Sequence, residues 1–139
     1  MPIRSIIEFG AGPYSTYLFL DPDAFPLLES LATFEHDGIW AEKIKVDDPR
    51  HRLFILPPEK FATMSTGMKA DFVFLDSGPS MTERLTLIPH CLTIAPIFAM
   101  HDCTVREFEH PGFKYLKAFN SIIQTVFASN TIDLSGLTL

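Results

Sequence analysis

The sequence is poor in the residues that would place it in several large classes of protein. It has only two cysteines, Cys91 and Cys103, which are too few for a disulfide framework or a zinc site built on cysteine. We therefore expect free thiols in a reducing compartment. Basic residues are outnumbered by acidic ones, and the net charge of −6 disfavours the basic surface that nucleic acids require.

Long hydrophobic runs are also missing. The most apolar stretch, residues 92–100, is far shorter than the ~20 residues that a helix needs to cross a bilayer. The residues before the first apolar run do not resemble the hydrophobic part of a signal peptide. We therefore expect a cytoplasmic protein that acts on a small molecule and binds neither a membrane nor nucleic acid.

The sequence does contain enough apolar material for a core. Hydrophobic residues make up 47% of the chain, and thirteen residues are phenylalanine. This composition is typical of a folded globular protein. A length of 139 residues without a linker, repeat or low-complexity tract predicts one domain over residues 1–139.

Short apolar runs alternate with segments of helical character, which is the pattern of a parallel α/β sheet with right-handed crossovers. Strands are expected at residues 6–9, 32–35, 51–56, 71–75 and 93–100. A first helix of about two turns is expected from Tyr14, with a break at Asp21-Pro22. Further helices are expected at 27–31, 39–44, 82–92 and within 105–118. For residues 59–69 the sequence leaves two structures open, a short helix or an ordered loop. Thr82 is a candidate helix cap. Residues 121–128 and 132–139 are expected to form an antiparallel hairpin.

The most informative stretch is residues 5–18, SIIEFGAGPYSTYL. An apolar strand ends in Gly10-Ala11-Gly12, where the backbone can turn sharply and a ligand can come close. Pro13 suits the first turn of a helix, and Ser15 and Thr16 place hydroxyls at its mouth. A strand, a glycine turn and a helix start form the opening half of a Rossmann-like βα unit.

Glu8, near the end of that strand, bears on the charge of the ligand. If its carboxylate points into the ligand crevice, it repels a pyrophosphate and suits a ligand with positive charge or with hydroxyl and amino donors. S-adenosylmethionine is cationic at sulfur and at its amino group, so it fits better than a dinucleotide. A nicotinamide-dependent oxidoreductase is disfavoured for this reason, and because the turn lacks a third glycine.

Four segments resemble, in the right order, motifs of the class I S-adenosylmethionine-dependent methyltransferases. They are residues 8–16, 34–37, 71–76 and 100–103. The first is closest to the subgroup written E-F-G-x-G-x-S-T. The resemblance implies a three-layer, Rossmann-like α/β fold with the seven-stranded methyltransferase sheet, mostly parallel and closed by a C-terminal antiparallel hairpin. It also implies a single S-adenosylmethionine-binding domain.

The resemblance further implies which residues contact the cofactor: Glu8, Gly10, Gly12, Ser15, Thr16, Glu35, His36 and Asp76. Glu35 ends the second expected strand and would accept hydrogen bonds from two ribose hydroxyls. An acidic residue there can instead interact with the dipole of the next helix, a role that Asp37 fits better. Relatives often hold the adenine amino group with a polar residue after the third strand. This chain has Leu56-Pro57-Pro58 there, so the adenine contact must come from the backbone or elsewhere.

Asp76, His101 and Asp102 follow the fourth and fifth expected strands and are the candidate catalytic residues. Methyl transfer is an in-line displacement, so the protein mainly aligns donor and acceptor, with a base where the acceptor is a hydroxyl. Asp76 can orient the donor or act as that base, and His101 is a base suited to neutral pH. Asp76 and Asp102 are also suited to Mg²⁺, but no third ligand is evident, so we expect no metal site. Arg84, on the expected helix after the fourth strand, can pair with a carboxylate or with a substrate anion, and a surface salt bridge is favoured.

These observations predict an S-adenosylmethionine-dependent methyltransferase that methylates a hydroxyl of a small molecule or sugar. The alternative is a non-catalytic binding or assembly protein of the same fold, which the brevity of the chain and the apolar residues 56–58 favour. A sheet with an exposed edge and an apolar composition suggest self-association as a homodimer.

Overall fold

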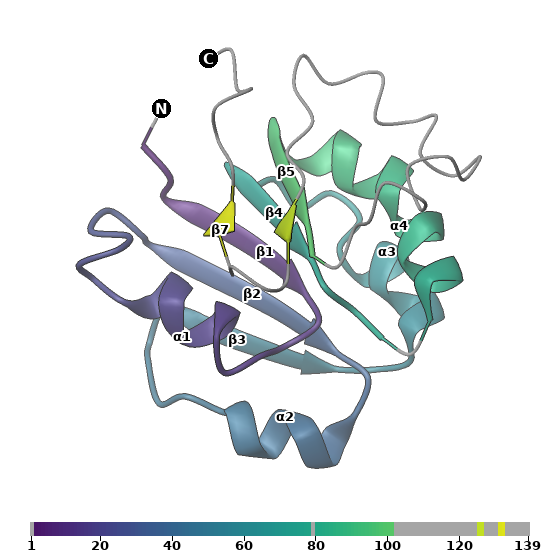
Figure 1. Ribbon diagram of the computed structural model, residues 1–139, viewed down its shortest axis with the longest axis horizontal. Helices are drawn as coiled ribbons and strands as arrows, with labels where there is room; N and C mark the ends of the chain where they lie inside the picture. The colour runs from purple at the N-terminus through teal and green to yellow at the C-terminus, as the bar shows by residue number, and fades with distance from the viewer. Residues whose placement is uncertain (1, 79, 102–124, 127–130, 133–139) are drawn as a thin grey trace.

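The computed structural model describes residues 2–78, 80–101, 125–126 and 131–132. Its centre is an all-parallel, five-stranded sheet in the order β3-β2-β1-β4-β5 (Figure 1). The strands are β1 (Ser5–Phe9), β2 (Ser30–Glu35), β3 (His51–Ile55), β4 (Phe72–Leu75) and β5 (Ile97–Met100). The order of the strands reverses between β1 and β4, as it does in Rossmann-like folds. The expected α/β class is therefore confirmed.

Helices connect the strands and lie on both sides of the sheet (Figure 1). They are α1 (Ser15–Leu20), α2 (Gly38–Ile44), the 3₁₀ turn η1 (Pro58–Lys60), α3 (Phe61–Met64) and α4 (Met81–Ile94). Phe19 and Leu20 of α1 belong to one apolar cluster of the sheet. Phe61 of α3 and Ile88 of α4 belong to the other, so α1 and α4 pack on opposite faces.

Successive side chains of the central strands alternate between these two clusters. Ile6 of β1 joins the α1 face, whereas Ile7 and Phe9 join the α4 face. Both faces of a parallel sheet are covered by helices, which explains why its strands appear in the sequence as continuous apolar runs. Glu8 and Thr33, which are register partners on β1 and β2, place buried polar side chains on the α1 face.

Several helix boundaries differ from those expected. Residues 27–31 do not form a helix, because the backbone N–H groups of Glu29 and Ser30 donate to the Arg4 carbonyl and draw the segment into β2. The cap of α4 is Ser80 rather than Thr82, with its side chain 3.3 Å from the Glu83 nitrogen. Strand β5, expected from residue 93, begins at Ile97, just after Pro96, because proline cannot donate a hydrogen bond within a sheet.

Two further short strands, β6 (Thr125–Val126) and β7 (Thr131–Ile132), pair antiparallel in a sheet of their own. The structure thus supports a five-stranded parallel sheet and not, over the described residues, a single sheet of seven. The expected helix within 105–118 and most of the expected hairpin lie outside the described residues. Of the helices that the structure describes, none is long and apolar enough to span a membrane.

Gly10 brings the ends of β1 and β4 together. Its φ of 97° lies in the left-handed region, and its N–H donates to the Phe34 carbonyl at 2.8 Å. A Cβ at this position would lie 2.6 Å from the carbonyl carbon of Asp76 and 2.7 Å from the nitrogen of Ser77. Only glycine fits at this point, because the chain that follows β4 occupies the place of a side chain.

We expect Gly10→Ala to destabilise the protein more than Gly67→Ala. Gly67 also has a positive φ, of 81°, but nothing lies within 4 Å of its Cβ position. Gly67→Ala should therefore lower the free energy of unfolding by about 1–2 kcal/mol for the strained backbone alone. Gly10→Ala should cost ~1–3 kcal/mol more, because the backbone of Asp76 must move. Urea unfolding of both variants measures the difference, and equal losses would contradict the close packing at Gly10.

Candidate functional site

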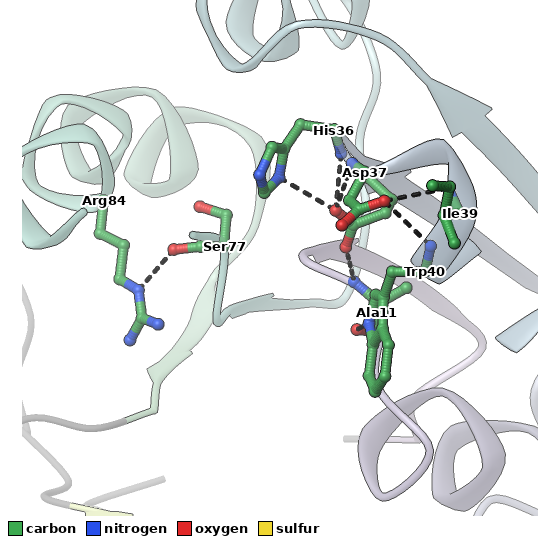
Figure 2. A network of polar contacts seen from close by, with 8 residues as sticks. Ala11, His36, Asp37, Ile39, Trp40, Ser77 and Arg84 are labelled. Carbon is green, nitrogen blue, oxygen red and sulfur yellow. Dashed lines mark hydrogen bonds and ion pairs between the residues drawn. The ribbon is translucent and has the colours of Figure 1, made fainter. Parts of the chain in front are cut away.

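Three segments meet at the carboxyl ends of β1, β2 and β4, where open α/β sheets bind their ligands. They are the glycine turn, residues 10–12, the end of β2, residues 35–37, and the segment that follows β4, residues 76–78. Figure 2 shows side chains from all three, with His36 between Ser77 and Asp37. A Cβ at Gly78 would lie 3.6 Å from Cε1 of His36, so the last two segments are in contact.

The carboxylate of Glu8 is enclosed by the protein. It is fully buried and accepts hydrogen bonds from the hydroxyls of Ser15 at 2.6 Å, Thr16 at 2.8 Å and Thr33 at 2.8 Å. Burial raises the pKa of Glu8 from 4.5 to about 7, although the three hydroxyls act in the opposite direction. The side chain therefore points toward α1, and the expectation that it faces the ligand crevice is wrong.

The same hydrogen bonds define the places of Ser15 and Thr16. Both hydroxyls donate to Glu8. The Thr16 oxygen also accepts a hydrogen bond from the Gly12 nitrogen at 3.1 Å. A Cβ at Gly12 would lie 3.2 Å from the Ser15 oxygen. These residues therefore hold the glycine turn against α1, and their expected contacts with a cofactor stay predictions.

Glu35 lies beside the glycine turn, as its place at the end of β2 predicted. It is almost fully buried and accepts hydrogen bonds from the backbone nitrogens of Ala11 at 2.9 Å, His36 at 2.7 Å and Asp37 at 2.9 Å. The Nδ1 atom of His36 lies 3.0 Å from the same carboxylate. A carboxylate has about four lone-pair sites, so contact with two ribose hydroxyls requires Glu35 to release one of these nitrogens.

Trp40 of α2 also contacts the turn, although no motif in the sequence pointed to it. Asp37 caps α2 by accepting hydrogen bonds from the nitrogens of Ile39 at 2.9 Å and Trp40 at 3.0 Å. The cap places the Trp40 indole so that its Nε1 donates to the Ala11 carbonyl at 2.7 Å (Figure 2). Both backbone groups of Ala11 are thus bound, one by Glu35 and the other by Trp40.

Arg84 of α4 connects the ends of β4 and β5. It is only 13% exposed, and its guanidinium donates to the carbonyls of Ser77 at 2.6 Å and His101 at 2.9 Å. Its Nη2 lies 3.1 Å from one Asp76 oxygen, and Nδ1 of His101 lies 3.3 Å from the other. The candidate catalytic residues Asp76 and His101 are therefore neighbours. The expectation of a surface salt bridge missed the two carbonyls that Arg84 binds.

The remaining candidates are less defined. Asp102, considered for catalysis and for Mg²⁺, lies outside the described residues. Within the described part of the chain, His, Cys, Asp and Glu form no group of three or more that could hold a metal ion.

The Ser77 hydroxyl is buried and has no hydrogen-bond partner among the described residues, so the site contains a polar group that a ligand could satisfy.

Comparison with known proteins supports the fold but identifies no family for this chain. No family model matches the sequence, and neither does any curated protein. Spermidine synthase from Thermotoga maritima has a similar structure, with a TM-score of 0.51 and 16% identity, over 68% of this chain and 35% of that chain. A Bacteroides thetaiotaomicron protein assigned as an epimerase matches with a TM-score of 0.46 and 17% identity, over 70% of this chain and 46% of that chain. The chain thus spans less than half of each, and the likeness to spermidine synthase is one of fold.

We expect Glu8→Gln to change how stability depends on pH. Because the pKa of Glu8 is about 7 in the folded state and 4.5 ordinarily, the folded protein binds more protons than the unfolded chain between these values. The contribution of Glu8 to the free energy of unfolding is therefore most favourable below pH 4.5. It is lost as the pH rises through 7, which lowers the free energy of unfolding by up to about 3 kcal/mol.

Unfolding in urea across this pH range measures the effect. The free energy of unfolding of wild type minus that of Glu8→Gln should fall as the pH rises. Glu59→Gln, at an exposed position, is the matched control and should leave the wild-type profile unchanged. A constant difference between wild type and Glu8→Gln would contradict the raised pKa.

We expect Arg84→Met to lower the free energy of unfolding by about 3 kcal/mol. The variant removes the donors of two carbonyls and the partner of the Asp76 carboxylate. Arg52→Met, at an exposed position of β3, is the control and should change stability by less than about 0.5 kcal/mol. Chemical unfolding of both variants tests this, and equal stabilities would show that Arg84 contributes no more than a surface arginine.

Proposed function

We propose that the chain binds S-adenosylmethionine at the carboxyl ends of β1, β2 and β4 and transfers its methyl group to a hydroxyl of a small molecule or sugar. One observation carries the proposal: the glycine turn lies at the switch point of the sheet and is hydrogen-bonded directly to Glu35. The Ala11 nitrogen is 2.9 Å from the Glu35 carboxylate. A turn beside an acidic group that ends the second strand is suited to a nucleoside.

Three further features support this proposal. The similarity of fold to spermidine synthase is consistent with a transferase built on this sheet. The buried Ser77 hydroxyl, which has no partner among the described residues, lies next to Asp76 at the same edge and is suited to a polar group of the ligand. The negative side chains of Glu35, Asp37 and Asp76 around the edge favour a ligand that carries positive charge.

The chemistry follows from the residues that meet there. S-adenosylmethionine supplies a methyl group on a positively charged sulfur. Glu35 would accept hydrogen bonds from the ribose, and Asp76, oriented by Arg84, would orient the acceptor hydroxyl. His101 or Asp76 would take the proton of this hydroxyl as its oxygen binds the methyl carbon and the bond between that carbon and sulfur breaks, which releases the demethylated cofactor with a neutral sulfur.

A non-catalytic binding protein of the same fold is the second candidate. It is favoured by the number of site groups that bind one another: Ser15 and Thr16 donate to Glu8, and Glu35 accepts from three backbone nitrogens. Such a protein would bind the nucleoside without transferring a methyl group to any acceptor. A screen of hydroxyl acceptors with radiolabelled S-adenosylmethionine distinguishes the two candidates.

We expect calorimetry to detect binding of S-adenosylmethionine and of its demethylated product, and Glu35→Gln to weaken both by at least about tenfold. The amide loses the charge that strengthens its hydrogen bonds to hydroxyl donors, which is worth about 1.5–3 kcal/mol. Glu29→Gln, at an exposed position, is the control with the same change in charge. Absence of binding at millimolar concentration would contradict the proposal, as would equal affinities of wild type and a folded Glu35→Gln protein.

A further inference from the structure

Helix α1 has an apolar face on the outside of the molecule. Its inward residues Thr16, Phe19 and Leu20 are buried against the sheet. On the opposite side of the helix, Tyr14 at the cap position is 80% exposed and Leu18 is 51% exposed. A helix that is apolar on both sides is normally buried on both sides. The outer face of α1 therefore has the composition of a contact surface.

Aromatic side chains continue this face toward α2. Tyr17 is 45% exposed and its hydroxyl lies 3.5 Å from the Lys43 carbonyl, so α1 and α2 are neighbours (Figure 1). Trp40 of α2 is also exposed and contacts Ala11, three residues before α1 is capped. Contiguous apolar side chains at the surface mark interaction sites. We call these four exposed side chains the α1–α2 patch: Tyr14, Tyr17, Leu18 and Trp40.

The α1–α2 patch is uncharged, but charges of opposite sign lie at two of its sides. Asp21 and Asp23, both exposed, follow the C-terminal end of α1, which itself contains no charged residue. Lys43 lies beside Tyr17 on α2. Glu42 is turned about 100° from Lys43 around the axis of α2, to the side away from α1. The patch therefore has an acidic side and a basic side.

A further ion pair lies near the acidic side. Arg50 donates to the carbonyl of Leu20, the last residue of α1, at 2.7 Å, and it is paired with Asp48 at the same distance. Because these two charges offset each other, the acidic side of the patch depends on Asp21 and Asp23.

This arrangement of charges favours a second copy of the chain as the partner. A net charge of −6 makes two copies repel each other over most of their surface, so they meet best where no charges face one another. In a two-fold symmetric dimer, the same patch of each copy meets itself. When the two-fold axis runs across the patch between its acidic and basic sides, the acidic side of each copy faces the basic side of the other.

We propose that the chain forms a homodimer in which the α1–α2 patches of two copies pack on each other, with Asp23 of each copy facing the partner's Lys43. The apolar side chains form the centre of the contact, and the two equivalent charge pairs lie at its rim. The partner copy lies beside the glycine turn, because Tyr14 follows Gly12 by two residues. This proposal does not depend on which ligand the turn binds.

Sedimentation velocity of the full chain at micromolar to millimolar concentrations tests the proposal. The wild type should show the mass of a dimer. Leu18→Glu places a charge at the centre of the patch in both copies and should raise the dissociation constant at least about tenfold. Met64→Glu is the matched control, because Met64 of α3 is 55% exposed and α3 packs on the other face of the sheet. It should leave the dissociation constant unchanged.

Exchanging the charges at the rim tests the orientation of the two copies. Lys43→Glu and Asp23→Lys each bring like charges together and should weaken the dimer by about threefold or more, whereas the double variant restores opposite charges and should recover the wild-type affinity. Added salt should reduce these differences.

Three results would overturn the proposal: a wild type that stays monomeric at millimolar concentration, a dimer that Leu18→Glu does not weaken, or a double variant weaker than both single variants. All four substituted positions are exposed, and circular dichroism of each variant verifies that it is folded.

Discussion

The structure depends on the close approach of two backbone segments, the turn after β1 at Gly10 and the chain after β4 at Asp76. Neither segment leaves room for a side chain between them. The contact fixes the two strands that flank the switch point and so determines which residues can meet there. Glu35 ends β2 and Asp76 follows β4, on either side of β1, and both lie at the same edge because this contact holds the ends of β1 and β4 in register.

A second set of interactions fixes the turn from the side of α2. Ala11 donates to Glu35 and accepts from the Trp40 indole, while Asp37 caps the helix that carries Trp40. The end of β2, the cap and the first turn of α2 thus act on a single residue, Ala11. A ligand that uses the Ala11 carbonyl or the Glu35 oxygens competes with hydrogen bonds of 2.7 and 2.9 Å. Its affinity is reduced by the free energy needed to replace them.

Much of the fold could be predicted, because buried parallel strands have a distinctive composition. The strands expected at 51–56 and 71–75 correspond to β3 and β4, and the acidic residue expected at the end of the second strand, Glu35, ends β2. Residues 27–31 were assigned wrongly because their apolar spacing suits a helix, while the hydrogen bonds to Arg4 that decide the matter come from a distant segment. The contacts of Trp40 and Arg84 are likewise non-local. No pattern within a short window predicts that an indole reaches Ala11 or that a guanidinium binds two carbonyls.

Glu8 shows that a place near the end of a strand does not determine whether a side chain points toward the ligand edge. It precedes the last residue of β1, so its side chain points to the face opposite that of Phe9, toward α1. There it meets Thr33 and the first turn of α1, whose hydroxyls donate to the buried carboxyl and offset part of the cost of burying its charge. The charge that a ligand meets at the edge therefore comes from Glu35, Asp37 and Asp76. Because Arg84 offsets the charge of Asp76, the proposal of a cationic nucleoside rests chiefly on the end of β2.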